Sequence, residues 1–187
     1  SVDFDGNAGY SFFVKDATDG MNIFNYSDVS GYTTPTIGDS VAIHGEVEQY
    51  NGLTELKADS IYVLNQGNPI GAPTTVTTLD ETTESEYIQL IGFEVVAGQS
   101  WAASGSNASV LITNGTDTLT LRIDKDTDID GSTAPAGKFD VKGIGSQFDF
   151  SQPVRLKRTL FVGSTSWGIS LLKKTTLPGT GSTLVTD

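Results

Sequence analysis

Alternating aspartates between residues 124 and 131 form the motif with the most definite chemistry. Its carboxylates are Asp124, Asp126, Asp128 and Asp130. The last three precede Gly131 at the spacing of the first half of an EF-hand loop, where alternate carboxylates converge on calcium. The glutamate that such a loop needs at position twelve is missing, because that position is Gly137. The motif is therefore a candidate calcium site, although a solvated acidic loop is the interpretation that we favour.

General acid–base chemistry has few candidates. His44 is the single histidine, and no serine or cysteine nucleophile motif lies near it in the sequence. Glu46 and Glu48 flank Val47 on one expected strand, and paired carboxylates can serve glycoside hydrolysis. Neighbouring exposed glutamates are ordinary on an acidic protein, so we expect these three residues on the polar face of a scaffold. No catalytic residue is predicted, and the chain is not expected to be an enzyme.

Four aromatic side chains could form stacking platforms for sugars or bases. They are Tyr32, Tyr50, Trp101 and Trp167. Small curved β-barrels do bind oligosaccharides and oligonucleotides in this way. The alternative is that these aromatic rings plug barrel ends or pack between modules, and that reading is the more common one for isolated aromatics.

The composition points to an all-β chain with many turns. Among 187 residues there are 21 glycines and no cysteine, and 37% are apolar. The absence of cysteine excludes disulfides, thiol catalysis and cysteine-ligated metals. No apolar run approaches the roughly 18–20 residues that a membrane-spanning helix needs. The chain begins with Ser1 and not with Met, so we expect a processed chain or a fragment of a longer one.

Charge is distributed unevenly along the chain. Residues 151–187 carry five basic side chains against Asp187, a net +4, and the whole chain carries −12, so residues 1–150 carry −16. Proteins that hold phosphate backbones normally present a basic surface, which argues against nucleic acid as a partner. This balance favours an extracellular protein and is compatible with bound cations.

Residues 38–56 carry the strongest structural pattern. Apolar residues alternate with polar ones along the first part, as in a half-buried strand, and Gly45 interrupts it as a bulge or bend would. Asn51-Gly52 then predicts a tight hairpin, because both residues tolerate positive φ. Residues 137–148 repeat the pattern, with Gly143 at the position of Gly45. We interpret the repeat as one architectural unit used twice, bent at both glycines.

In addition to the strands within residues 38–56, we expect strands at residues 9–14, 21–26, 60–64, 87–96, 109–113, 118–123 and 139–148, the last of which lies in the second repeat. A Gly-, Pro- and Thr-rich stretch at 67–78 predicts a linker. A helical turn within residues 79–86 would take Thr78 or Asp80 as N-cap. The predicted organisation is module 1 at residues 1–66, module 2 at 79–153, and a C-terminal β-segment with a flexible tail at 154–187.

These runs resemble a known family of modules. The runs 12–24 (FFVKDATDGMNIF), 37–56 (IGDSVAIHGEVEQYNGLTEL) and 60–70 (SIYVLNQGNPI) are similar to OB-fold modules of secreted, multidomain Bacteroidota-type proteins. Residues 121–149 resemble the module that commonly follows. The resemblance implies two tandem OB-like Greek-key barrels on a cell surface or outside the cell, often beside extracellular nuclease, phosphoesterase or lamin-tail domains. It implies no catalytic residue, and it does not extend beyond Pro153.

The basic C-terminal segment suggests assembly. Its candidate residues are Arg155, Lys157, Arg158, Leu160 and Val162. A β-prone basic segment could complete the open sheet of a neighbouring acidic copy, which is β-strand addition, and a contact that does not close would make a filament. The alternative is that the segment folds back onto its own chain.

We therefore expect a non-catalytic structural or adhesive module, whose partners are further copies of itself or neighbouring domains of a longer chain. The second candidate is an accessory module for carbohydrate or single-stranded nucleic acid, attached to an extracellular hydrolase. Exposed aromatics along a groove would favour that candidate, whereas a flat acidic face would favour a spacer. No cofactor is predicted besides the possible calcium.

Overall fold

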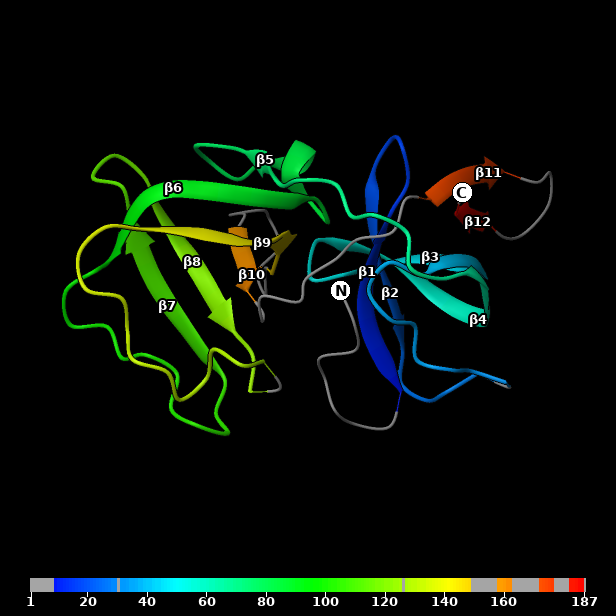
Figure 1. The fold of residues 1–187 in the computed structure, drawn as a ribbon, viewed down its shortest axis with the longest axis horizontal. Coiled ribbons are helices and arrows are strands. Elements are labelled where there is room, and N and C mark those ends of the chain that lie inside the picture. The colour runs from blue at the N-terminus through cyan, green and yellow to red at the C-terminus, as the bar shows by residue number, and fades with distance from the viewer. Residues whose placement is uncertain are drawn as a thin grey trace. The chain divides into compact units, whose positions relative to one another are not determined.

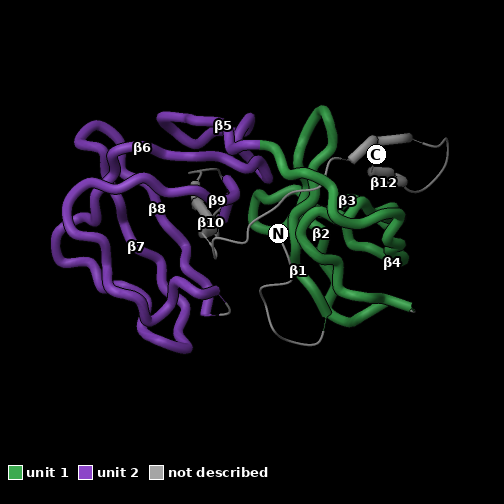
Figure 2. The backbone as a smooth tube through the Cα atoms, viewed as in Figure 1, with its two compact units in different colours: residues 1–71, 167–187 green, residues 72–166 purple. Residues whose placement is uncertain are grey.

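The computed structural model describes residues 9–29, 31–125, 127–148, 158–162, 172–176 and 182–186. Regular structure in this part of the chain consists of twelve strands and one short 3-10 helix, so the all-β prediction is confirmed (Figure 1). The chain divides into two compact units (Figure 2). Unit 1 comprises residues 1–71 and 167–187, and unit 2 comprises residues 72–166. The boundary falls inside the predicted linker, and the predicted C-terminal segment is divided between the units.

Unit 1 contains an open six-stranded sheet in the order β1-β2-β4-β3-β12-β11 (Figure 1). Its strands are β1 (Tyr10–Lys15), β2 (Gly20–Asn25), β3 (Ser40–Tyr50), β4 (Leu53–Asn65), β11 (Leu172–Thr176) and β12 (Ser182–Thr186). β2 and β4 run parallel, and the other neighbouring strands run antiparallel. A strand from the far end of the chain is therefore paired directly with β3.

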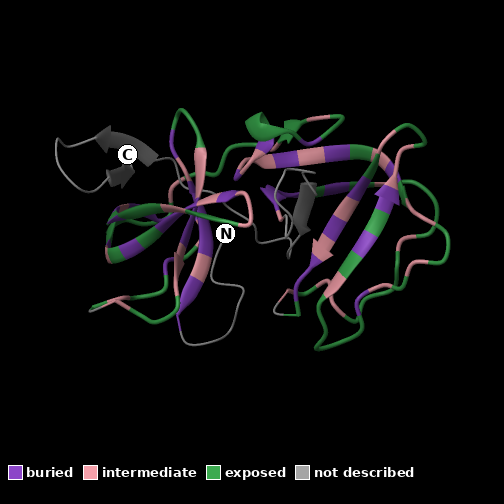
Figure 3. Cartoon of the chain, turned by 180° about the vertical axis from the view of Figure 1, so that it is seen from behind, coloured by how far each residue is buried: buried purple, intermediate pink, exposed green. Residues whose placement is uncertain are grey.

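Alternating apolar residues hold the unit 1 sheet together. The buried cluster consists of Tyr10, Phe12, Val14, Ile23, Val41, Ile43, Leu56, Ala58 and Ile61. Successive side chains of a strand point to opposite faces, so the alternation seen in the sequence becomes one buried face. Figure 3 shows buried and exposed positions interleaved along the strands. Each large apolar side chain removed from water stabilises the fold by about 1.5–3 kcal/mol.

The predicted hairpin and bulge of residues 38–56 are both present. Tyr50 faces Leu53 across the turn, and Asn51 and Gly52 adopt φ values of 50° and 93°. The register between β3 and β4 shifts between His44 and Gly45, which is the predicted bulge. Only glycine fits there, because a Cβ on Gly45 would lie 2.8 Å from the Cα atom of Ala58 and closer still to the Lys57 carbonyl oxygen.

Two local predictions for unit 1 are wrong. Residues 60–64 are not a separate strand, because β4 continues without interruption from Leu53 to Asn65. The predicted flexible tail contains β12, whose residues Ser182 to Val185 face Gly45 to Ala42 in antiparallel register. Both errors concern pairing with a distant strand, which local composition does not encode.

Unit 2 contains a second six-stranded sheet in the order β5-β6-β7-β8-β10-β9, in which β6 also pairs with β9. Its elements are β5 (Thr74–Thr75), the 3-10 helix η1 (Glu81–Thr83), β6 (Tyr87–Val95), β7 (Ala108–Thr113), β8 (Thr118–Ile123), β9 (Phe139–Gln147) and β10 (Arg158–Val162). β6, β7, β8, β10 and β9 are thus hydrogen-bonded in this order, and β9 is also hydrogen-bonded to β6. That either unit is an OB-like barrel stays a prediction.

β6 is bent, and it pairs with three strands, β5, β7 and β9. Its first residues, 87–90, pair with β9, and Glu94 and Val95 pair with β7. The register shifts at Gly92, which has a φ of +72° and donates its N–H to Asp140 Oδ1 at 2.9 Å. The strand is therefore bent at Gly92.

The second repeat differs from its prediction in one detail. β9 keeps its register with β6 through Gly143, so no bulge lies there. The glycine that the packing requires is Gly145, because residues 83–86 cross it. Its N–H donates to the Glu86 carbonyl at 3.0 Å, and its carbonyl accepts from Ser85 N–H at 2.7 Å. Asp80 caps η1 in a capping box with Thr83, as one of the two predicted N-caps.

Candidate functional site

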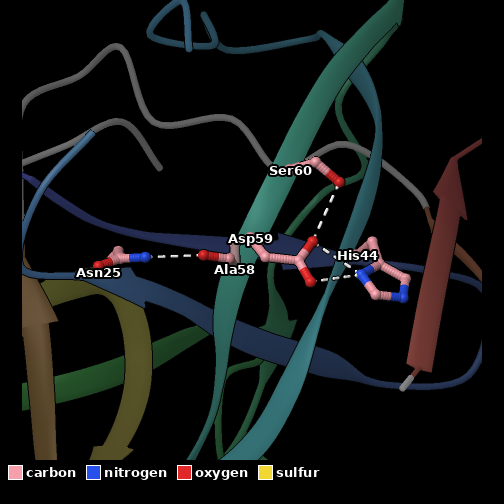
Figure 4. A network of polar contacts seen from close by, with 5 residues as sticks. All are labelled: Asn25, His44, Ala58, Asp59 and Ser60. Carbon is pink, nitrogen blue, oxygen red and sulfur yellow. Dashed lines mark hydrogen bonds and ion pairs between the residues drawn. The ribbon is translucent and has the colours of Figure 1, made fainter. Parts of the chain in front are cut away.

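A polar network links β3 and β4 on the exposed face of unit 1 (Figure 4). His44 Nδ1 lies 2.7 Å from both carboxylate oxygens of Asp59, and Ser60 Oγ donates to Asp59 Oδ1 at 3.1 Å. Next to it, Asn25 Nδ2 donates to the carbonyl of Ala58 at 2.7 Å. The antiparallel register places His44 opposite Ser60, so the hairpin itself brings these side chains together.

The network contains the residue types of a serine hydrolase but not their geometry. In such an enzyme the histidine accepts the serine proton and the aspartate orients the histidine. Here the Ser60 hydroxyl donates to Asp59 and not to the imidazole of His44. The His44 and Asp59 side chains are 46% and 62% exposed, and a surface pair of this kind stabilises a fold by about 0.2–1 kcal/mol. The network fixes two adjacent strands and activates no nucleophile.

Two hollows follow β4 beside this network. One of about 410 Å³ is lined by Asn25, Val29, Glu46 and residues 57–59, and one of about 610 Å³ is lined by Gly31, Thr33 and residues 61–66. The second contains three consecutive exposed apolar residues. Tyr62 is 64% exposed, Val63 37% and Leu64 50%. Exposed apolar residues on both faces of one strand mark a contact surface more than a half-buried sheet.

The backbone of β4 is also open along these hollows. β2 pairs with β4 through Glu55, Leu56 and Lys57, and the Asn25 side chain then covers the Ala58 carbonyl. Beyond that point, no strand among the described residues pairs with β4 on the side away from β3. We call residues 59–65 the β4 edge. Such an edge can accept an additional strand.

One buried carboxyl lies at the other end of the same hairpin. Glu55 is 5% exposed and faces Glu48 across the β3–β4 pair. Burial raises the pKa of Glu55 above its usual value, the neighbouring Glu48 carboxylate raises it further, and Lys57 partly offsets both effects. The folded protein therefore disfavours the ionised form of Glu55.

We expect Glu55→Gln to stabilise unit 1 at neutral pH. The pKa of Glu55 is higher in the folded protein than its unfolded value of 4.5. Below pH 4.5 the carboxyl is protonated in both states and burial costs no stability. Stability is lost as pH rises through the folded pKa, because the buried carboxyl must then ionise. Thermal unfolding at pH 7 should show a higher melting temperature for the variant, and the difference should vanish near pH 4. Glu94→Gln, at an exposed position of β6, is the control. Equal melting temperatures of Glu55→Gln and wild type at pH 7 would contradict the expected cost of burying the ionised Glu55 carboxyl.

The predicted stacking aromatics among the described residues have different surroundings. Tyr32 stacks on Tyr10 with ring centroids 4.4 Å apart and packs against the unit 1 core. Trp101 packs against the core of unit 2 and donates Nε1–H to Ser132 Oγ at 3.1 Å. Tyr50 is half exposed at the end of the hairpin, and Trp167 lies outside the described residues. Tyr32 and Trp101 thus each pack against the core of their own unit, and ligand binding by these aromatics stays a prediction.

The acidic loop is held to a neighbouring loop. Asp130 Oδ2 accepts the Gly105 N–H at 2.5 Å, and Gly131 N–H donates to the Ala102 carbonyl at 2.9 Å. Lys125 N–H donates to Asn107 Oδ1 at 2.7 Å. Together with the Trp101–Ser132 bond, these contacts join residues 101–107 to residues 125–132.

Of the four predicted calcium ligands, Asp124 is 7% exposed and Asp126 lies outside the described residues. Asp128 is exposed, and Asp130 binds the neighbouring loop. The described residues contain no group of three or more acidic, histidine or cysteine side chains placed to hold a metal ion. Calcium binding by this loop stays a prediction.

The predicted assembly residues lie partly in β10. Arg155 and Lys157 are outside the described residues, and Arg158, Leu160 and Val162 belong to β10. β10 pairs in parallel with β8 and antiparallel with β9, so its backbone is engaged on both sides. The strand of the basic segment that lies at a sheet edge is instead β11, which contains Lys173 and Lys174.

Sequence reasoning missed Asp59 and the β4 edge. One signal was available, because Ile61, Tyr62, Val63 and Leu64 are consecutive apolar residues and a half-buried strand has polar residues at alternate positions. Comparison with protein-family models, with curated proteins and with solved structures finds no match for the chain. Among the described residues no helix is long and apolar enough to cross a membrane.

Proposed function

We propose that this chain is a non-catalytic structural or adhesive module of a secreted protein, which assembles with further copies by β-strand addition. The observation that supports this most is the position of β12. A strand from the far end of the chain pairs with β3 through residues 182–185. The described C-terminal strands thus fold back onto their own chain, which was the alternative to assembly, and the pairing indicates that this sheet accepts a strand that is distant in sequence. Strand addition would supply such a strand from another copy.

The two units support the same interpretation. In unit 2, Gly143 of β9 faces Ile88 of β6, the first long strand of that unit. In unit 1, the corresponding Gly45 of β3 faces Ser182 of β12. A C-terminal strand therefore takes the place beside β3 that an N-terminal strand takes beside β9. A strand at the end of a long connection can reach the equivalent place on another copy, which is the arrangement of domain swapping.

Charge favours contacts between copies over contacts with nucleic acid. Residues 9–71 carry eight acidic and two basic side chains, and residues 151–187 carry a net +4. Opposite charges at the two ends of one chain attract the ends of different copies. The second candidate, an accessory module for carbohydrate or single-stranded nucleic acid, receives less support, because Tyr32 and Trp101 are used in packing.

Sedimentation velocity over a wide range of protein concentration tests the proposal. We expect species larger than the monomer to grow with concentration and to diminish as salt screens the charges. Added oligonucleotide or oligosaccharide should leave the boundary unchanged. A monomer at every concentration would overturn the assembly function, and a ligand-dependent shift would favour the accessory-module alternative.

A further inference from the structure

We infer that the contact between copies is made by β11 of one copy on the β4 edge of the next. This inference rests on the proposed function and assigns its two surfaces. The partner is a second copy of this chain, and the contact extends one sheet from copy to copy.

The pairing register places the two surfaces at opposite ends of one four-stranded ribbon. β12 faces residues 42–45 of β3, and these residues face positions 58–62 of β4. β11 pairs with β12 on the side away from β3 and is the last strand of this sheet among the described residues. The ribbon therefore runs from the β4 edge through β3 and β12 to β11.

Within the described part of the chain, no further strand pairs with either end of the ribbon, and the two ends are of similar length. The β4 edge comprises residues 59–65, and β11 comprises the five residues 172–176. At about 3.3 Å per residue, β11 spans roughly 17 Å, which the β4 edge can accommodate. The hollow of about 610 Å³ along residues 61–66 leaves room for a strand on this side of β4.

The charges of the two ends are complementary. Asp59 belongs to the β4 edge, and Glu46 and Asp59 both line the adjoining hollow. β11 carries Lys173 and Lys174. The exposed apolar residues Tyr62 and Leu64 give the contact an apolar part that salt does not screen. A contact between different surfaces of identical chains closes into a ring only at particular angles and otherwise continues as a filament.

Disulfide trapping tests the contact, because the chain has no cysteine of its own. Tyr62→Cys places a cysteine on the β4 edge. Lys174→Cys and Thr175→Cys place a cysteine on one or the other face of β11. In one copy, β4 and β11 are separated by β3 and β12, about 14 Å at three strand spacings, whereas a disulfide needs Cα atoms within about 7 Å. A chain with one cysteine on each strand should therefore form bonds only between copies.

On mild oxidation at an assembling concentration, we expect one of the two double variants to give a ladder of covalent multimers, and each single variant to give dimers at most. Tyr62→Cys combined with Leu111→Cys, an exposed position of β7, controls for random collision. Reversing Lys173 and Lys174 to glutamate should weaken assembly several-fold, and Asp59→Lys in that background should restore part of it. Near-UV circular dichroism and thermal melting check that each variant is folded.

The outcomes separate this inference from the proposed function. Assembly without a ladder above the control, or assembly unaffected by the charge reversal, overturns the β11–β4 contact and leaves strand addition elsewhere. A chain that stays monomeric overturns both. A ladder together with charge-dependent assembly supports the contact.

Discussion

Gly145→Ala is expected to destabilise unit 2 by about 3 kcal/mol, at the upper end of the effects of overpacking. A Cβ at this position would overlap with the carbonyl oxygen of Thr83 and lie 2.9 Å from its carbonyl carbon. Residues 83–86 cannot move away cheaply, because Ser85 N–H and Gly145 N–H each make a backbone hydrogen bond across this crossing. The methyl group must therefore break those bonds or displace η1.

Urea denaturation followed by fluorescence and circular dichroism measures this effect. Gly71→Ala is the matched control, because a Cβ on Gly71 would have no atom within 4 Å, and it should stay within about 0.5 kcal/mol of wild type. Equal midpoints for the two variants would contradict the crossing of residues 83–86 over β9.

Ile112→Ala is expected to cost about 2–5 kcal/mol, the usual range for large-to-small changes in a core. Ile112 lies on β7, is fully buried and belongs to the core of unit 2. Its neighbour Leu111 is 38% exposed, because successive side chains of a strand point to opposite faces.

Leu111→Ala removes the same number of atoms from the adjacent position and should cost under about 1 kcal/mol. The same urea experiment compares the two variants. A reversed order would mean that β7 presents the opposite face to the core, which corresponds to a register slip of one residue.

Local features of the fold could be predicted from the sequence because short-range chemistry determines them. Asn51-Gly52 makes the β3–β4 hairpin through positive φ values that few other residues tolerate. Gly45 marks the bulge, and Asp80 caps η1 with its own side chain. Alternating apolar residues predicted most strands, because a strand with one buried face has apolar residues at every second position.

Features that depend on distant pairing could not be predicted in the same way. Position 145 requires glycine because residues 83–86 cross the strand there, and no residue near Gly145 in the sequence indicates that crossing. β12 is a short strand rich in serine and threonine, which reads locally as a tail. Its partner on β3 is set by backbone hydrogen bonds, which carry no side-chain signature.

The candidate site follows the same division. The sequence suggested β-strand addition by a basic segment, but it assigned that role to residues 155–162, of which the last five form β10 inside unit 2. The β4 edge exists because the pairing of β2 with β4 ends at Lys57, and the sequence does not indicate where that pairing ends. His44 was expected on the polar face, and it lies there, paired with Asp59.

Amide hydrogen exchange of residues 59–65, compared between dilute and concentrated protein, is the sharpest test of whether unit 1 extends its sheet with a strand from another copy. We expect alternate amides of the β4 edge, those pointing away from β3, to become protected as concentration rises, while exposed amides of unit 2 do not change. Equal exchange of the β4 edge at both concentrations would contradict this extension of the sheet.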